Sequence, residues 1–89
     1  MIVLINKSFA KDTKAIFDRN ILNQIAEIID EVENAKILNE IKNCKKLKGS
    51  FNTFRIKLGQ YRIGIFIDND TVEFVRILHR KVIYKYFPK

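Results

Sequence analysis

Residues 54–67 read FRIKLGQYRIGIFI, and this stretch decides the fold. Apolar and polar side chains alternate on both sides of Gly59-Gln60, which is the period-two pattern of two β-strands. A glycine at the first of two connecting residues is typical of a type II′ hairpin turn. Such a turn predicts these cross-strand pairs: Leu58 with Tyr61, Lys57 with Arg62, Ile56 with Ile63 and Arg55 with Gly64.

This hairpin register brings cations together. Directly paired residues share one face of a sheet, so Arg55, Lys57 and Arg62 are expected on the face opposite the apolar core. Gly64 lies among them, and its small size predicts a shallow positive depression suited to a phosphodiester. The alternative is an ordinary solvated outer face of a half-buried sheet.

Residues 71–79, TVEFVRILH, predict a third strand that is apolar on both faces. Arg76 decides its facing, because burying an unpaired guanidinium is costly. We therefore expect a connecting loop with an odd number of residues. That register places Arg76 beside Arg62 on the basic face and directs Val75 and Ile77 into the core.

The first half of the chain predicts one strand and two helices. Residues 2–5 form a short apolar run, and apolar residues recur at helical spacing over 9–17 and 21–33. Ser8 and Asn20 are the candidate N-caps. The short break between the helices predicts an antiparallel pair.

The predicted architecture is α+β. A small antiparallel sheet of about four strands carries two N-terminal helices on one face, in a single domain of residues 1–89. The N-terminal strand lies at an edge or beside the last strand. Residues 35–47 have no sustained period and predict at most a helical turn around 37–41.

Composition limits the classes of function. A hydrophobic share of 47% argues against disorder, and the absence of a long apolar run or a leader predicts a soluble cytoplasmic protein without membrane association. The single Cys44 excludes an internal disulfide and offers no zinc cluster. No nucleotide-binding or hydrolase motif is present, so we expect no metal and no small-molecule cofactor.

The positive charge is concentrated in the second half of the chain. The formal net charge is +7, yet residues 1–41 carry net −2 and residues 42–89 carry net +9. Clustered cations gain affinity for a polyanion by releasing its counterions, so nucleic acid is the expected partner. The alternative is a surface that charge merely keeps soluble.

Three segments then carry a family resemblance: KLKG at 46–49, FRIKLGQYRIGIFID at 54–68 and VRILHRKVIYKYFP at 75–88. They resemble the motifs of RelE/ParE-superfamily toxins from toxin–antitoxin pairs, and the match covers nearly the whole chain. The resemblance implies two helices on one face of a small sheet, an active surface on the other face, and a cognate antitoxin as partner.

The RelE branch of this superfamily implies a ribosome-dependent endoribonuclease. Such an enzyme cuts messenger RNA in the ribosomal A site by attack of a ribose 2′-hydroxyl on the adjacent phosphate, without a metal. The reaction asks for a base, cations around the phosphate, an acid for the leaving oxygen and a stacking surface. The resemblance assigns the catalytic set to Arg55, Lys57, Arg62, Arg80 and Tyr84.

Some of these assignments leave alternatives open. Lys57 is the general base by position, and His79 is the other candidate. The match at Tyr84 depends on a small gap, and another placement moves that position to Tyr86 or Phe87. Further RNA contacts are expected from Lys46, Lys48, Arg76 and Lys81.

Two other functions fit the same resemblance. One is a ParE-like protein that inhibits DNA gyrase by binding it, and the other is a non-catalytic member that only binds an antitoxin. Four basic positions together with Tyr84 favour the nuclease, because an inhibitor of a protein has no evident need for them.

Overall fold

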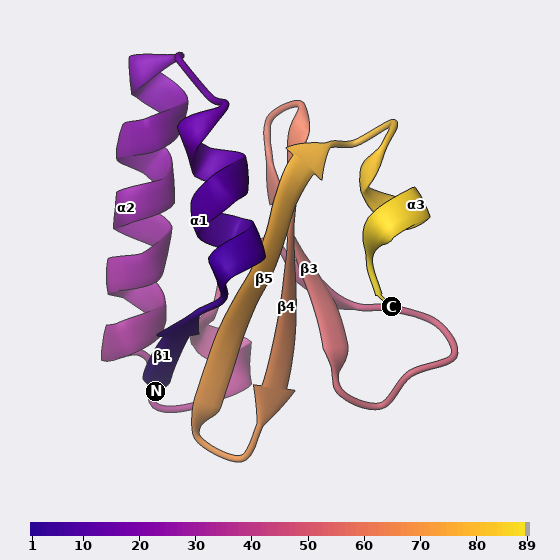
Figure 1. The fold of residues 1–89 in the computed structure, drawn as a ribbon. Helices are drawn as coiled ribbons and strands as arrows, with labels where there is room; N and C mark the ends of the chain where they lie inside the picture. The colour runs from indigo at the N-terminus through magenta and orange to yellow at the C-terminus, as the bar shows by residue number, and fades with distance from the viewer. Residues whose placement is uncertain (89) are drawn as a thin grey trace.

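The computed structural model describes residues 1–88 and has a three-layer arrangement (Figure 1). Helices α1 and α2 run antiparallel on one side of a sheet, and a short helix α3 lies on the other side. The elements in chain order are β1 (Ile2–Ile5), α1 (Lys7–Lys14), α2 (Arg19–Asn34), a 3-10 turn (Leu38–Glu40), β2 (Cys44–Lys46), β3 (Thr53–Leu58), β4 (Tyr61–Asp68), β5 (Thr71–His79) and α3 (Ile83–Tyr86).

The strand order is β1-β5-β4-β3-β2, with β1 parallel to β5 and the other neighbours antiparallel. The α+β class, the paired helices and the edge position of β1 beside β5 are confirmed. The sheet is mixed and has five strands, where about four antiparallel strands were expected. The additional strand, β2, has three residues, which is too short to show a period in the sequence.

The β3–β4 hairpin has the predicted register. All four expected pairs are present, from Leu58 opposite Tyr61 to Arg55 opposite Gly64. Gly59 adopts a φ of +56°, the left-handed conformation that the first position of a type II′ turn favours. The local signals in residues 54–67 were therefore sufficient to fix this part of the sheet.

The connection between β4 and β5 differs from the prediction. Asp68 pairs with Thr71, so the turn has two residues, and Asn69 there has a φ of +54°. An even loop would by itself direct Arg76 into the core. The odd residue comes instead from a β-bulge within the strand.

At this bulge Gly64 pairs with Arg76 while Ile65 pairs with Phe74, which leaves Val75 without an opposite residue. Phe74 and Ile77 consequently both point into the core and are buried. The facing predicted for Arg76 and Ile77 is correct. The prediction that Val75 joins the core is wrong, because the bulge leaves this residue half-buried.

Both helix starts lie earlier than the sequence suggested. Asn6, not Ser8, caps α1, and its Oδ1 accepts a hydrogen bond from the Ser8 backbone N–H at 3.0 Å. Asp18, not Asn20, caps α2, and its Oδ1 accepts from the backbone N–H of Asn20 at 2.9 Å. A carboxylate or amide two residues before the predicted cap competes successfully for the same free backbone donors.

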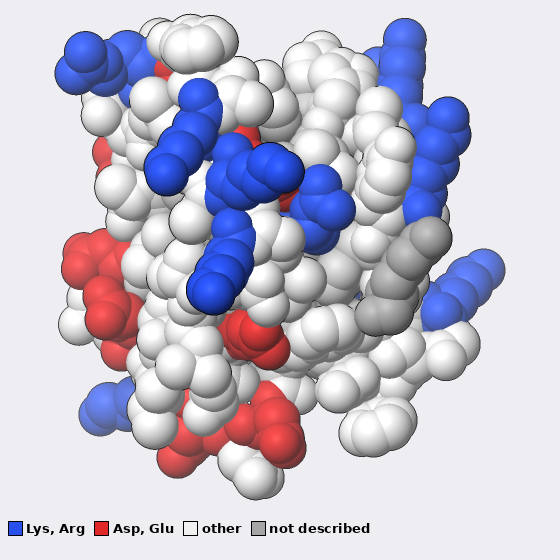
Figure 2. Space-filling model, viewed as in Figure 1, with Lys and Arg blue, Asp and Glu red and all other residues white. Residues whose placement is uncertain are grey.

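The two long helices bury one apolar side against the sheet. Phe9 of α1 meets Phe74 of β5 edge to face, with ring centroids 5.4 Å apart. The acidic side chains of α2 lie on its outer side, where Figure 2 shows a group of red residues at the left. The main buried residues of this core are Phe9, Ile16, Ile25, Val32, Ile56, Ile63, Ile65, Phe74 and Ile77.

The C-terminal segment covers the opposite face of the sheet. Ile83 and Phe87 are buried there, and the rings of Phe87 and Phe66 lie 5.3 Å apart. The Phe87 ring rests directly on Gly64, since a Cβ at Gly64 would come within 2.5 Å of Phe87 Cδ2. The depression expected at Gly64 is therefore filled by an aromatic ring.

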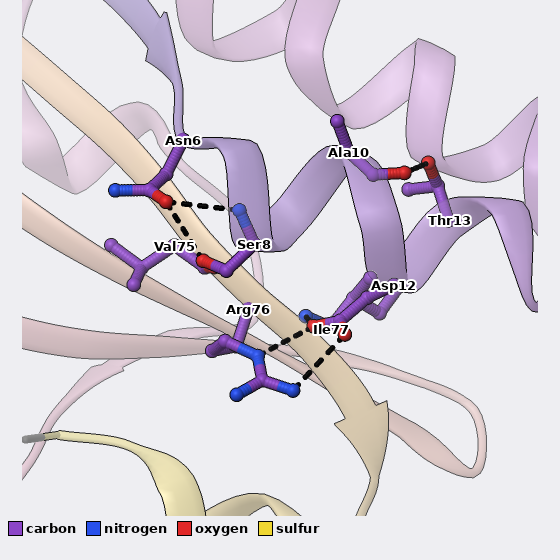
Figure 3. Close-up of polar contacts among 8 residues, drawn as sticks. All are labelled: Asn6, Ser8, Ala10, Asp12, Thr13, Val75, Arg76 and Ile77. Carbon is purple, nitrogen blue, oxygen red and sulfur yellow. Dashed lines mark hydrogen bonds and ion pairs between the residues drawn. The ribbon is translucent and has the colours of Figure 1, made fainter.

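Helix α1 completes the outer edge of β5 (Figure 3). Strand β1 ends at Ile5, so beyond Phe74 the outer edge of β5 has no strand partner, while β4 still pairs along the other edge. Two α1 side chains one turn apart supply the missing partners: the Ser8 hydroxyl donates to the Val75 carbonyl, and Asp12 Oδ2 accepts from the Ile77 N–H at 3.0 Å.

We predict that Gly64→Ala destabilises the fold by about 1–3 kcal/mol, because the new methyl group overlaps the Phe87 ring. Phe87→Ala removes that overlap, so Gly64→Ala should cost much less when introduced into the Phe87→Ala background. Urea denaturation of the four proteins measures this coupling. Equal costs in both backgrounds would show that the ring does not rest on Gly64.

We predict that Asp12→Ala lowers the free energy of unfolding by about 1–3 kcal/mol, because Ile77 and Arg76 both lose a charged partner. Asp30→Ala is the matched control, since Asp30 is an exposed helical aspartate without a side-chain hydrogen bond among the described residues. Chemical denaturation compares the two. A similar loss for both variants would contradict the role of Asp12 at the β5 edge.

Candidate functional site

Three of the five predicted catalytic residues, Lys57, Arg62 and Arg80, lie at the end of the sheet that carries the β3–β4 turn. Lys57 pairs with Arg62, and Arg62 lies opposite Leu78 near the end of β5. The Arg80 backbone N–H then donates to the Gln60 carbonyl in the turn at 2.7 Å. The backbones of Lys57, Arg62 and Arg80 are thus brought together by two strands and the residue that follows a third.

Arg62 is on the predicted face but is not a freely exposed cation. The residue is only 9% exposed, and its Nη1 donates to the carbonyl oxygens of Gly59 at 2.9 Å and Tyr61 at 2.8 Å. The guanidinium therefore holds the hairpin turn and places a fixed positive charge beneath it. Such a charge contributes to an anion site without reorganisation.

Lys57 and Arg80 are exposed cations at this end of the sheet. Arg55 is half-buried, and its Nη1 donates to the Asn43 carbonyl at 2.9 Å. Lys81 is exposed next to Arg80. Exposed cations beside one fixed cation form a surface that can hold a phosphate and neutralise charge that develops on it.

His79 lies on the opposite face of the sheet from Lys57 and Arg62. It pairs with Tyr61, so the strand register places it on the face of α1 and α2, opposite Lys57 and Arg62. Its ring contacts Tyr61 with centroids 6.4 Å apart, and its Nδ1 accepts from the Lys81 N–H at 3.2 Å. Of the two candidate bases, only Lys57 therefore shares the face of Arg62.

Arg76 shares the face of Arg62 but is already paired. Its Nε and Nη2 donate to the two carboxylate oxygens of Asp12 at 2.7 and 3.0 Å, and its guanidinium lies 5.4 Å from the centre of the Tyr86 ring. The hydrogen bond to Asp12 raises the pKa of Arg76 above its ordinary value. Its charge is thus fixed and offset by a neighbouring carboxylate.

Lys45 and Lys46 of β2 lie on opposite faces of the sheet. Lys46 pairs with Phe54, whose side chain joins the core, so Lys46 belongs to the helix side of the sheet. Lys45 pairs with Arg55 and shares the face of the candidate site. Sequence reasoning missed Lys45, because only the register of β2 distinguishes the two lysines. Lys48 is exposed in the following loop.

The three candidates for the C-terminal aromatic position differ in solvent exposure. Tyr84 is 55% exposed and Tyr86 is 49% exposed, whereas Phe87 is 1% exposed. Tyr86 is engaged with the Arg76 guanidinium, and Phe87 with Gly64. Tyr84 is therefore the candidate with a ring that is accessible and not used by either contact.

The described residues offer few other chemical groups. Within residues 1–88, no three His, Cys, Asp or Glu side chains come together as ligands for a metal ion. Burial raises the pKa of the Cys44 thiol to about 11, so this thiol is protonated at neutral pH. Over the same residues, no helix combines the length and apolar character needed to cross a membrane.

The sequence closely matches a named toxin along its whole length. Toxin RelE3 of Methanocaldococcus jannaschii is 48% identical over 89 residues, which cover 99% of this chain and 100% of that protein. A RelB–RelE antitoxin–toxin complex from Methanococcus jannaschii contains a chain that is 46% identical, with a TM-score of 0.81 over 96% of this chain and 99% of the other.

The fold also matches a more distant structure. An archaeal RelE–RelB complex from Pyrococcus horikoshii OT3 superposes with a TM-score of 0.72 at 20% identity, over 89% of this chain and 93% of that one. The family model described as the ParE toxin of the type II toxin–antitoxin system parDE matches residues 3–84. The chain therefore belongs to the ParE toxin family of type II toxin–antitoxin systems, within the RelE/ParE superfamily that its motifs resemble.

Proposed function

We propose that this toxin is a ribosome-dependent endoribonuclease that cleaves messenger RNA in the A site and so inhibits translation. The observation that carries the proposal is the group of cations at the β3–β4 turn. Lys57 and Arg80 are exposed there beside the fixed charge of Arg62. A surface of this kind suits the crowded negative charge of a phosphodiester during cleavage.

The proposed reaction is a transesterification within the RNA. The ribose 2′-oxygen forms a bond to the adjacent phosphorus as the bond from phosphorus to the 5′-oxygen breaks, which leaves a 2′,3′-cyclic phosphate and a 5′-hydroxyl. In our proposal the deprotonated amine of Lys57 takes the 2′ proton, and Arg62 and Arg80 stabilise the phosphate. The Tyr84 hydroxyl donates a proton to the departing 5′-oxygen, and its ring offers a stacking surface. Arg55 adds positive potential next to Lys57.

RNA contacts beyond the scissile phosphate follow from the facing of the cations. We assign them to Lys81 beside Arg80, to Lys48 in the β2–β3 loop and to Lys45 beside Arg55. Lys45 replaces Lys46 in this role because of its side of the sheet. Arg76 contributes less than the sequence suggested, since Asp12 offsets its charge.

The partner proteins follow from the relatives. Two of the similar structures are complexes of RelE with RelB, and we propose that a cognate antitoxin likewise binds this chain. The toxin then acts in the cytoplasm, where translating ribosomes are found, and the antitoxin controls it.

A second candidate is inhibition of DNA gyrase. It is favoured by the family model, which takes its description from the ParE toxin. A non-catalytic antitoxin-binding member is a third. The exposed side chains of Lys57, Arg80 and Tyr84 support the nuclease, because neither alternative has an evident use for them.

The deciding experiment adds purified toxin to ribosomes translating a defined message and maps the RNA ends. A gyrase supercoiling reaction runs alongside with the same protein. We expect cuts at A-site codons and normal supercoiling. Intact message with inhibited supercoiling would favour the gyrase inhibitor, and no effect in either reaction would favour the non-catalytic member.

We predict that Arg80→Ala lowers the rate of message cleavage on ribosomes by at least about 100-fold, because a cation beside the developing charge is lost. Its side chain is exposed, so the variant should remain folded. Lys85→Ala, which removes another exposed cation from the C-terminal segment, is the matched control. Equal single-turnover rates for the two variants would contradict the role of Arg80.

Arg62 is less suited to this test, because its side chain also holds the turn. Arg62→Ala is expected to lower both activity and stability, and a thermal melt separates the two effects.

A further inference from the structure

Helix α1 carries a stripe of three lysines that the charge distribution along the sequence did not predict. Lys7, Lys11 and Lys14 are the exposed residues of this helix. Their spacing of four and three residues places them within about 60° around the helix axis and along about 10 Å of its length. Figure 2 shows blue side chains gathered over α1 in this view.

No carboxylate of α1 offsets this stripe. The only acid of the helix, Asp12, turns toward β5 and pairs with Arg76 and the Ile77 N–H. The nearest acid of β5 at the start of the helix, Glu73, accepts a hydrogen bond from Asn6 Nδ2 at 2.9 Å. The negative net charge of residues 1–41 comes mainly from α2, whose acids lie on the outer side of that helix.

Lys7 is also unfavourable for the helix itself. It occupies the first position of α1, where the positive end of the helix dipole lies, and the first turn contains no acidic residue. A cation at this position lowers helix stability. Its presence there, in line with Lys11 and Lys14, is better explained by a ligand outside the helix.

The stripe and the candidate catalytic site lie in different layers. Helix α1 packs on one side of the sheet, whereas Lys57 and Arg62 belong to the other face. A short single strand of RNA held at the catalytic cations therefore does not extend over the outer side of α1. The stripe is therefore accessible to a second anionic partner.

The chemistry of the stripe fits RNA better than protein. All three exposed side chains are lysines, and α1 presents no exposed apolar residue among them. Protein interfaces are depleted in lysine at their centres and rely on apolar and aromatic anchors. A row of flexible ammonium groups instead suits the repeated phosphates of an RNA backbone, which are recognised by shape and charge and not by sequence.

We propose that Lys7, Lys11 and Lys14 dock the toxin on the backbone of ribosomal RNA, separately from the site that holds the message. This inference rests on the proposed ribosome-dependent function, because the ribosome supplies structured RNA next to the A-site codon. The stripe then gives affinity for the ribosome, and the opposite face of the sheet performs the cleavage.

The test compares Lys7→Gln/Lys11→Gln with the control Lys36→Gln/Lys42→Gln. The control removes the same charge from two exposed lysines near the acidic surface of α2. Binding to empty small ribosomal subunits is measured by cosedimentation over a series of salt concentrations. Binding to a short single-stranded RNA is measured in parallel.

We expect Lys7→Gln/Lys11→Gln to weaken binding to the subunits by about tenfold or more. The slope of the logarithm of the binding constant against the logarithm of the salt concentration should fall in magnitude by about one to two. The control variant should bind the subunits within about twofold of the wild-type affinity. The affinity of Lys7→Gln/Lys11→Gln for the short RNA should also change by less than about twofold. Unchanged binding to subunits would overturn the proposal. An equal loss on the short RNA would also overturn it, because the stripe would then contact the message.

The binding experiment tests the docking surface separately from the nuclease activity. If the wild-type toxin binds subunits through these lysines but does not cut messages, the nuclease assignment fails and the docking surface stands. If the wild-type toxin does not bind subunits, the docking proposal fails whatever the RNA-end mapping shows.

Discussion

The structure depends on the way in which α1 completes the outer edge of β5. Strand β1 is too short to pair with all of β5, and unpaired backbone groups at a packed edge are costly. Ser8 and Asp12 supply the partners from one face of α1, and Asp12 also holds the guanidinium of Arg76. These contacts fix the helix layer to the sheet beside the bulged residue Val75, so the far end of β5 and the following Arg80 have a defined position.

That position decides where chemistry is available on the other face. The middle of the face is closed, because Phe87 covers Gly64 and Arg76 is paired with Asp12. The accessible cations are at the β3–β4 turn, where Arg62 forms a fixed charge under Lys57. This small domain thus presents a cationic edge, which supports the proposal that cleavage takes place on a larger RNA platform.

The hairpin was predictable from the sequence because its signals are local: a period of two and a glycine at the first turn position. The bulge at Val75 was not, since it depends on a helix that lies more than 60 residues earlier in the chain. The same holds for the Phe87 ring on Gly64 and for Lys45, whose facing follows from a three-residue strand. Sequence reasoning therefore found which residues are basic and on which face of the hairpin they lie. It did not find which of these side chains are exposed and which, like Arg62 and Arg76, are held by contacts within the chain.

The most direct measurement of the proposed function is an electron cryomicroscopy structure of the toxin on a ribosome whose A-site codon carries 2′-O-methyl groups, which prevent cleavage. We expect the scissile phosphate next to Lys57 and Arg80, with the Arg62 guanidinium beneath the turn and α1 facing ribosomal RNA. A toxin bound outside the A site, or a phosphate held far from the β3–β4 turn, would contradict the assignment of this end of the sheet as the catalytic site.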